Sequence, residues 1–249
     1  MRELRYGGGL LAGGLAYRLF LWLVPLGLVG AVVFSFWIEY GETSVDKAAE
    51  EFGIGAAAIA SAENAVETSS TNRVWLLVGG LVFLAWCSVF FVKALQVAYA
   101  LAWEVERPRM RRPLHAALVF NGLVLGTAVG ALALAWLREA VGLGALAGVL
   151  GTLALSTGLS LVIMRLLPNR AHRWQDLLPG ALLLTVGTQL LQVAVVFYFA
   201  PKLERSSELY GVLGLSAVLL VWLYVLARLM TGAAFLNATV WERRYASRE

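Results

Sequence analysis

The sequence has very few of the residues from which metal sites and covalent catalytic centres are built. Its 249 residues include one cysteine, Cys87, and two histidines, His115 and His172. A single cysteine excludes an intramolecular disulfide, and because Cys87 lies in an apolar run it indicates neither redox chemistry nor a thiolate metal site. The histidines stand at the edges of different apolar runs, without another ligand at metal-binding spacing. The chain also lacks a nucleophile elbow, a phosphate-binding loop and a dinucleotide fingerprint, so we expect no enzymatic activity, no metal and no cofactor.

Charge is scarce as well. Only 14% of the residues are charged and 60% are hydrophobic, whereas about a quarter of the residues in an average soluble domain are charged. One membrane span needs roughly 20 apolar residues, so the chain has room for about six spans and no separate soluble domain. The sequence therefore predicts an all-α, polytopic membrane protein, a bundle of six transmembrane helices that forms a single domain over residues 1–249.

Long apolar runs alternate with short polar segments along the whole chain. The predicted spans cover about residues 7–37, 73–103, 114–137, 141–167, 177–200 and 210–240. A short polar link, residues 201–208, separates the last two spans, which form a hydrophobic hairpin. Residues 38–72 are acidic and rich in alanine, and they form the one sizeable loop outside the membrane.

Lysine and arginine are divided unevenly between alternate loops. The N-terminus, two basic loops and the tail hold twelve of them, namely Arg2, Arg5, Arg107, Arg109, Arg111, Arg112, Arg165, Arg170, Arg173, Arg243, Arg244 and Arg248. The other three loops hold five, namely Lys47, Arg73, Arg138, Lys202 and Arg205. Cytoplasmic loops carry the excess of these residues, so both termini are predicted to be cytoplasmic and the acidic loop to face outward. The same rule explains the basic loops without nucleic acid as a partner.

Three cations, Arg18, Lys93 and Arg228, lie inside apolar runs that contain no aspartate or glutamate. An unpaired charge in hydrocarbon costs several kcal/mol, and such a residue is a candidate functional residue. Counted from the outer ends of their spans, the three stand 19, 20 and 18 residues deep. These counts correspond to roughly 27 to 30 Å, near the cytoplasmic edge of the hydrocarbon core. We therefore expect the three cations to share one layer.

Two interpretations of this layer stay open. In one, each cation extends to the cytoplasmic headgroups and contributes only to orientation. In the other, the three converge on an anion, such as a phosphate or a carboxylate, at the inner mouth of a cavity. The runs continue with mostly apolar residues for about ten positions beyond each cation. Such continuation favours the second interpretation slightly: either the spans are steeply tilted, or their inner ends pack on one another and enclose the cations.

Polar residues also recur along the last two spans. Thr185, Thr188, Gln189 and Gln192 fall on one face of a helix. Tyr224, Arg228 and Thr231 recur at similar spacing on the following span. Such residues either form hydrogen bonds between helices or line a polar path. Under the second alternative, Gln189, Gln192 and Tyr224 join the three cations as candidate substrate-binding residues.

Five segments resemble the YihY/BrkB family of bacterial inner-membrane proteins, and the likeness extends over nearly the whole chain. They are Leu15-Ala16-Tyr17-Arg18-Leu19-Phe20 to Pro25, Leu178-Pro179-Gly180-Ala181, Tyr210-Gly211-Val212-Leu213-Gly214, Leu220-Val221-Trp222-Leu223-Tyr224, and Gly232-Ala233-Ala234-Phe235-Leu236-Asn237-Ala238. The resemblance implies a multi-pass protein of the inner membrane with six spans and both termini inside. It implies no catalytic motif, although an older family label is ribonuclease BN and a transport role for lipid-linked or other anionic molecules has been suspected.

The leading hypothesis is a transporter or flippase-type protein that handles an anionic, lipid-like substrate among membrane lipids. The alternative is a membrane scaffold that recruits partners through the acidic outer loop and transports nothing. A ribonuclease is disfavoured, because no cluster of acids or histidines is available to hold a catalytic metal. Whether the protein forms a homo-oligomer is left open by the sequence.

Overall fold

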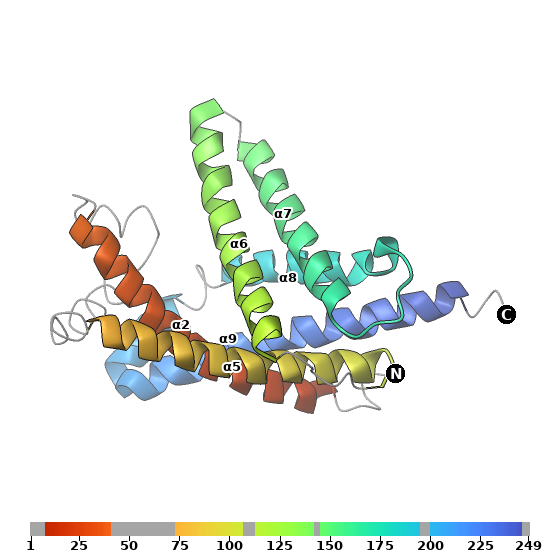
Figure 1. Cartoon of the computed structure of the whole chain (residues 1–249), viewed down its shortest axis with the longest axis horizontal. Helices are drawn as coiled ribbons and strands as arrows, with labels where there is room; N and C mark the ends of the chain where they lie inside the picture. The colour runs from red at the N-terminus through yellow and green to blue at the C-terminus, as the bar shows by residue number, and fades with distance from the viewer. Residues whose placement is uncertain (1–7, 41–72, 107–112, 142–144, 195–199, 246–249) are drawn as a thin grey trace. The chain divides into compact units, whose positions relative to one another are not determined.

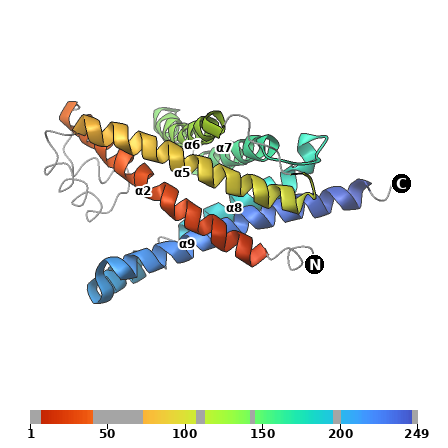
Figure 2. The ribbon, with the colours of Figure 1, turned by 60° about the horizontal axis from the view of Figure 1, so that its bottom comes forward.

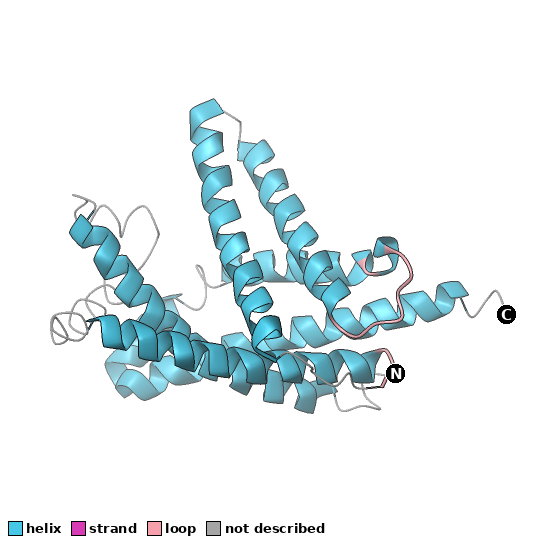
Figure 3. Cartoon of the chain, viewed as in Figure 1, coloured by secondary structure: helices cyan, strands magenta, loops and turns pink. Residues whose placement is uncertain are grey.

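The computed structural model describes residues 8–40, 73–106, 113–141, 145–194 and 200–245. Within these residues the fold is all helical and contains no strand (Figures 1 and 3). The helices are α2 (Gly8–Tyr40), α5 (Arg73–Ala102), α6 (Pro113–Val141), α7 (Ala145–Leu166), the 3-10 helix η1 (Trp174–Asp176), α8 (Leu178–Ala194) and α9 (Ala200–Tyr245). The predicted acidic loop lies outside the described residues apart from positions 38–40, which belong to α2.

Four of these helices are long and apolar enough to cross a membrane. Their apolar stretches are Gly8–Val33, Val74–Ala102, Gly148–Leu166 and Ser216–Tyr245. Two shorter apolar helical segments, Pro113–Thr127 and Leu178–Ala194, belong to α6 and α8. Because a helix of this composition can cover its apolar surface only with lipid or with another protein, the chain is a membrane protein.

The predicted polar link at residues 201–208 is part of a helix. Helix α9 begins at Ala200 and continues for 46 residues, which corresponds to roughly 69 Å. Pro201 occupies the first turn of this helix, where the missing N–H group has no intrahelical partner to lose. Glutamate and arginine are good helix formers, so a polar stretch ends the apolar run without ending the helix. The predicted polar link at residues 201–208 therefore belongs to the same helix as the last predicted span.

The chain packs as two compact units, Leu21–Cys87 and the remainder, Met1–Phe20 with Ser88–Glu249. In the smaller unit the second part of α2 and the first part of α5 approach closely at Gly80. A Cβ atom at this position would lie 2.8 Å from Leu28 Cδ2 and 3.0 Å from Val29 Cγ2. The absence of a side chain at Gly80 therefore permits the close contact of the two helices.

In the larger unit α6, α7, α8 and α9 pack in chain order, each against the next. Helices α6 and α7 lie side by side in both views (Figures 1 and 2). Hydrogen bonds between side chains also connect the helices. Asn121 of α6 donates to Ser88 Oγ of α5 at 2.7 Å, and Thr157 of α7 donates to Thr185 of α8 at 3.2 Å.

Helices α8 and α9 run antiparallel and are joined by a fully buried asparagine. Asn237 of α9 accepts a hydrogen bond from the backbone N–H of Gly180 at 2.6 Å. Gly180 lies in the first turn of α8, where backbone N–H groups have no partner within the helix. The amide of Asn237 also donates to Met164 Sδ of α7 at 3.4 Å. Asn237 therefore caps α8 from another helix and connects three helices at one point.

This junction brings together two of the segments that carry the family resemblance. Leu178-Pro179-Gly180-Ala181 supplies the start of α8, and the segment that ends in Asn237-Ala238 supplies its cap. A Cβ atom on Gly180 would lie 2.5 Å from the carbonyl oxygen of Ala233 and 2.6 Å from Asn237 Cγ. Because both distances are far below van der Waals contact, only glycine fits here without a shift of the two helices.

Candidate functional site

Two of the three predicted cations meet at one residue of α5. The guanidinium of Arg18, on α2, donates from Nη1 to the carbonyl oxygen of Phe90 at 2.9 Å. The ammonium of Lys93 lies over the ring of the same phenylalanine, 5.7 Å from its centroid. Arg18 stands ten residues after the start of α2 and Lys93 nine residues before the end of α5. Both are therefore about 14 Å from the helix ends that the sequence predicts to be cytoplasmic.

Within the described part of the chain, neither Arg18 nor Lys93 has an ion-pair partner. Their charges are balanced only by the dipole of the Phe90 carbonyl and the face of its ring. A carbonyl and an aromatic face attract cations but carry no net charge. The two cations, from α2 and α5, thus approach the same residue, Phe90.

The third predicted cation, Arg228, lies on α9. One turn before it, the hydroxyl of Tyr224 approaches Gly9 of α2, 3.8 Å from the position that a Cβ atom would occupy. Gly9 precedes Arg18 by nine residues, about 13 Å along α2. This contact packs α9 against the start of α2. A layer that includes Arg228 therefore stays a prediction.

The polar stripe of α8 turns toward α7. Thr185 is buried and receives the bond from Thr157 of α7, and Thr188 donates back to the Thr185 carbonyl at 2.9 Å. The side of α8 that contacts α9 carries Gly180 and Gly187 instead. On α9, Thr231 bonds the carbonyl oxygens of Ala227 and Arg228 in its own helix.

Gln189 and Gln192 therefore belong to a face that α9 does not cover, and Gln192 is exposed. The structure does not bring them next to Tyr224 through any contact that it describes. Their role in a polar path remains a prediction.

The ends of α5, α7 and α9 gather into one polar cluster, which we call the inner-end cluster. Arg170, on the loop that links α7 to η1 (Figure 3), donates to the carbonyl oxygen of Glu104 at 2.5 Å. The ring of His172 stacks on Trp241 of α9, with 6.4 Å between centroids and 4° between planes. Trp103, at the end of α5, contacts the other side of this group with its ring 6.0 Å from that of Trp241. The distribution of lysine and arginine predicts that these three segments lie on one side of the membrane, and the structure brings them together.

A buried carboxylate holds the inner-end cluster to α9. Asp176 is 2% exposed and accepts a hydrogen bond from the backbone N–H of Arg173 at 3.2 Å. Tyr245 donates its hydroxyl to Asp176 Oδ2 at 3.5 Å, and Arg244 lies 3.6 Å from Asp176 Oδ1. Since a buried charge needs compensation, these three donors from the loop and α9 keep Asp176 stable in its position.

Replacement of Asp176 tests this contact. We expect Asp176→Ala to lower the free energy of unfolding by about 2 kcal/mol, because the N–H of Arg173 loses its buried acceptor. Arg244→Gln should cost only about 0.5 kcal/mol, because the arginine side chain is 51% exposed and its ion pair is screened by water. Thermal unfolding of the purified protein in one detergent measures both. Equal effects of the two substitutions would contradict the leading role of the backbone bond.

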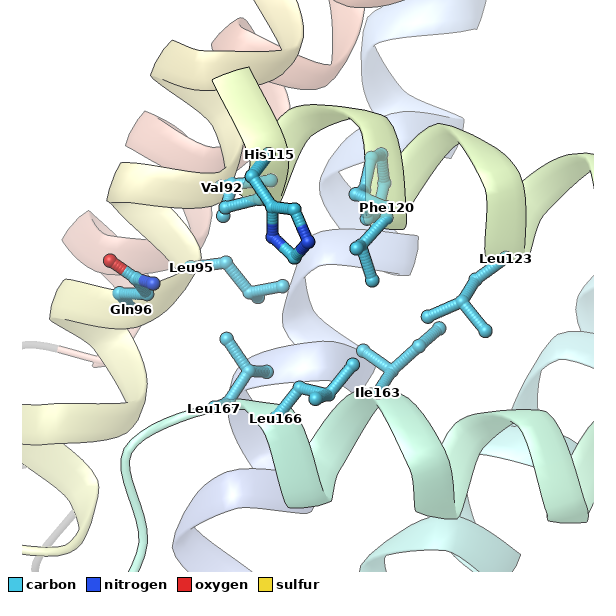
Figure 4. A pocket seen from close by; sticks show the side chains of 11 residues that line it. Val92, Leu95, Gln96, His115, Phe120, Leu123, Ile163, Leu166 and Leu167 are labelled. Atoms are coloured by element: carbon cyan, nitrogen blue, oxygen red, sulfur yellow. The ribbon is translucent and has the colours of Figure 1, made fainter. Parts of the chain in front are cut away.

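A groove at the same end of the larger unit has an apolar half and a polar half. The apolar half, a cavity of about 230 Å³, lies between α5, α6 and α7. Figure 4 shows Leu95 of α5, Phe120 of α6 and Ile163 of α7 around it, with His115 and Gln96 near its rim. The polar half, about 560 Å³ and more open, is formed by the loop residues that follow α5 and α7. Gln96, Leu166 and Leu167 line both halves, so the two lie next to each other.

The polar half contains residues that the sequence analysis did not select. Arg165 was counted only as an orientation charge, and Glu106 was not singled out. Gln96, a polar residue in an apolar run, was the one signal in the sequence that pointed to this place. None of the six predicted substrate-binding residues lines either half of the groove. Among the described residues, no group of three histidines, cysteines or acids is placed to hold a metal ion.

The helices and their apolar surfaces define an integral membrane protein. The family model for virulence factor BrkB matches residues 4–249, and the chain belongs to this family. The resemblance predicted from the sequence segments is therefore confirmed.

Several relatives of the chain are named UPF0761 membrane proteins. A UPF0761 membrane protein of Laribacter hongkongensis is 30% identical over 187 residues, which cover 66% of this chain and 42% of that protein. A UPF0761 membrane protein of Xanthomonas campestris pv. campestris is 26% identical over 230 residues, 86% of this chain and 53% of the relative. That of Methylibium petroleiphilum is 27% identical over 231 residues, 87% and 55% of the two chains. The chain thus spans about half the length of these relatives, and no solved structure matches it significantly.

Proposed function

We propose that this protein spans the bacterial inner membrane six times, with both termini in the cytoplasm, and moves an anionic, lipid-like substrate across it. The six spans would be the four long apolar helices together with α6 and α8, whose apolar segments are shorter. The inner-end cluster supports the orientation. It gathers the loop after α5, the loop after α7 and the end of α9, which carry arginines at one side.

The observation that carries the proposed transport is the pair of cations at Phe90. Arg18 and Lys93 come from different helices and approach the same residue about 14 Å from the helix ends. Positive charges in apolar helices are costly away from water. A phosphate or carboxylate that contacts both cations would lower this cost, which supports an anionic substrate.

A lipid-like substrate follows from the surroundings of the pair. Leu15, Leu19 and Leu95 are buried beside the two cations in sequence, and Tyr17 and Phe90 are exposed on the same helices. A substrate that reaches the cations from the side of the bundle must therefore cross an apolar surface. An acyl chain is compatible with that surface, whereas a small hydrophilic anion is not.

Flipping of a labelled anionic lipid tests the proposal. The purified chain would be reconstituted in vesicles that contain fluorescent phosphatidylglycerol, and its transfer between leaflets would be followed by dithionite quenching. We expect Arg18→Gln combined with Lys93→Gln to lower the rate about tenfold, the effect of losing one to two charge-assisted hydrogen bonds. Arg18→Lys and Lys93→Arg keep the charges and should retain most of the rate.

Arg173→Gln provides the matched control, because it removes one exposed positive charge outside the helices. It should leave the rate unchanged. If the double variant flips the lipid as fast as the wild type, the two cations only extend to headgroups. If the wild type does not exceed empty vesicles with this lipid, flipping of an anionic phospholipid is excluded.

A further inference from the structure

The apolar half and the polar half of the groove between α5, α6 and α7 are arranged like the acyl chains and the headgroup of a phospholipid. The apolar half lies among helix residues such as Leu95, Phe120 and Ile163. The polar half is formed by residues just beyond the ends of α5 and α7, including Glu106 and Asn169. At the edge of a membrane, the helix residues face acyl chains and the loop residues face headgroups. An amphiphile that enters from the bilayer therefore meets matching surfaces without a change of depth.

The polar half carries one charge of each sign. Arg165 donates from Nη1 to the carbonyl oxygen of Ala171 at 2.6 Å, and its guanidinium lies 5.8 Å from the ring centroid of Trp174. These contacts hold the side chain, and among the described residues its other N–H donors have no partner. Glu106 lines the same half and, within the described residues, has no ion-pair partner. The two charges thus share a groove without closing on each other.

The turn after α5 fixes the position of Glu106. Glu104 has a φ of 50°, and the N–H of Val105 bonds the carbonyl oxygen of Ala100 at 3.0 Å. A left-handed residue followed by this bond is a Schellman ending of a helix. The bond from Arg170 to the Glu104 carbonyl attaches the turn to the loop after α7. Glu106 and Arg165 are therefore held on two segments that are connected to each other.

We propose that this groove binds a zwitterionic phospholipid with a primary ammonium headgroup, of the phosphatidylethanolamine type. The phosphate accepts hydrogen bonds from Arg165, and the ammonium donates to the carboxylate of Glu106. Gln96, which lines both halves, lies where the ester region passes from headgroup to chain. One acyl chain occupies the apolar half.

Charge complementarity selects this headgroup over the other common ones. Phosphatidylglycerol has the phosphate but no cation for Glu106, so the carboxylate repels its net negative charge. Phosphatidylcholine has a cation without N–H donors, so it forms no hydrogen bond with the carboxylate. The site shares no residue with the pair at Phe90, and the two proposals can fail independently.

Lipid titration of the full chain tests the proposal. The purified protein would be stripped of lipid, and binding of phosphatidylethanolamine, phosphatidylglycerol and phosphatidylcholine with identical chains would be measured by native mass spectrometry. We expect phosphatidylethanolamine to bind about tenfold more tightly than the other two, the factor that one charge-assisted hydrogen bond supplies. O-phosphoethanolamine at the same concentration should not compete, because it lacks the chain. Equal binding of the three lipids, or competition by the free headgroup, would overturn the proposal.

Single substitutions then test the roles of Glu106 and Arg165 separately. Glu106→Gln should remove the preference over phosphatidylglycerol, and Arg165→Gln should weaken both lipids about tenfold. Arg173→Gln, which removes an exposed arginine of the same loop outside the groove, should change neither. Unchanged selectivity in Glu106→Gln, with a normal elution profile in size-exclusion chromatography, would reject the role of the carboxylate.

Discussion

Replacement of Gly180 by alanine is expected to lower the free energy of unfolding by about 3 kcal/mol, near the upper end for overpacked sites. The new Cβ atom would overlap Asn237 and lie 2.5 Å from the backbone carbonyl oxygen of Ala233. A backbone carbonyl in the middle of α9 cannot rotate away, so α8 and α9 must separate. The resulting loss of packing and of the bond between Gly180 and Asn237 should appear in thermal unfolding in detergent.

Two other glycines provide graded controls for Gly180→Ala. Gly187→Ala meets only the end of the Leu229 side chain, which can change rotamer, so we expect a cost of about 1 kcal/mol. Gly158 has nothing within 4 Å of its hypothetical Cβ atom, and Gly158→Ala should be neutral or stabilise α7 slightly. Equal behaviour of the three variants would show that helix propensity, and not the α8–α9 contact, determines the result.

Replacement of Asn237 by alanine should have an effect of similar size, about 3 kcal/mol, through a different cause. The N–H of Gly180 would lose its only described partner inside the protein, and the amide contact with Met164 would disappear. An unsatisfied buried donor costs about 1 to 3 kcal/mol, and the cavity left by the side chain adds to this. Thermal unfolding under the same conditions measures the change.

Thr239 offers a control on the same helix. Its hydroxyl bonds only the Phe235 carbonyl oxygen of its own helix at 2.8 Å, so Thr239→Val should cost less than about 0.5 kcal/mol. The double variant Gly180→Ala with Asn237→Ala should be less unstable than the sum of the single variants, because the smaller residue at 237 relieves part of the overlap. Strict additivity would contradict the direct contact between the two positions.

The sequence predicts the presence of membrane helices better than it predicts where each helix ends. Low charge and long apolar runs are sufficient to predict helices in a membrane, since lipid allows no other way to pair the backbone of such runs. The residues at which these helices end were harder to predict. Residues 201–208 are polar, but polarity ends only the apolar surface, and good helix formers with Pro201 in the first turn let α9 continue.

Counting residues along a span gives a depth in the membrane, which stays a prediction, but it does not give the direction of a side chain. Counting placed Arg18 and Lys93 at equal depth, and the structure adds that both turn toward Phe90. For the α8 stripe, the period of the sequence identified one face of the helix. Which neighbour that face meets depends on the packing of α7 and α9, and Thr185 turned out to meet Thr157.

The groove could not be predicted for the same reason. Arg165 lies in the last turn of α7, Glu106 lies beyond the end of α5, and 59 residues separate them in the chain. The turn at Glu104 and its bond to Arg170 connect the end of α5 to the loop after α7.

The amino-acid sequence alone determined that this protein is a helical membrane protein of the BrkB family, because composition and the order of short motifs are properties of the chain itself. The tertiary structure decided which residues meet: Gly180 with Asn237, Arg18 and Lys93 at Phe90, and Arg165 with Glu106 in one groove. Such meetings depend on the rotation of each helix about its axis. Close contacts such as those at Gly180 and Gly187 set that rotation. The periodicity of residues along one helix does not predict it.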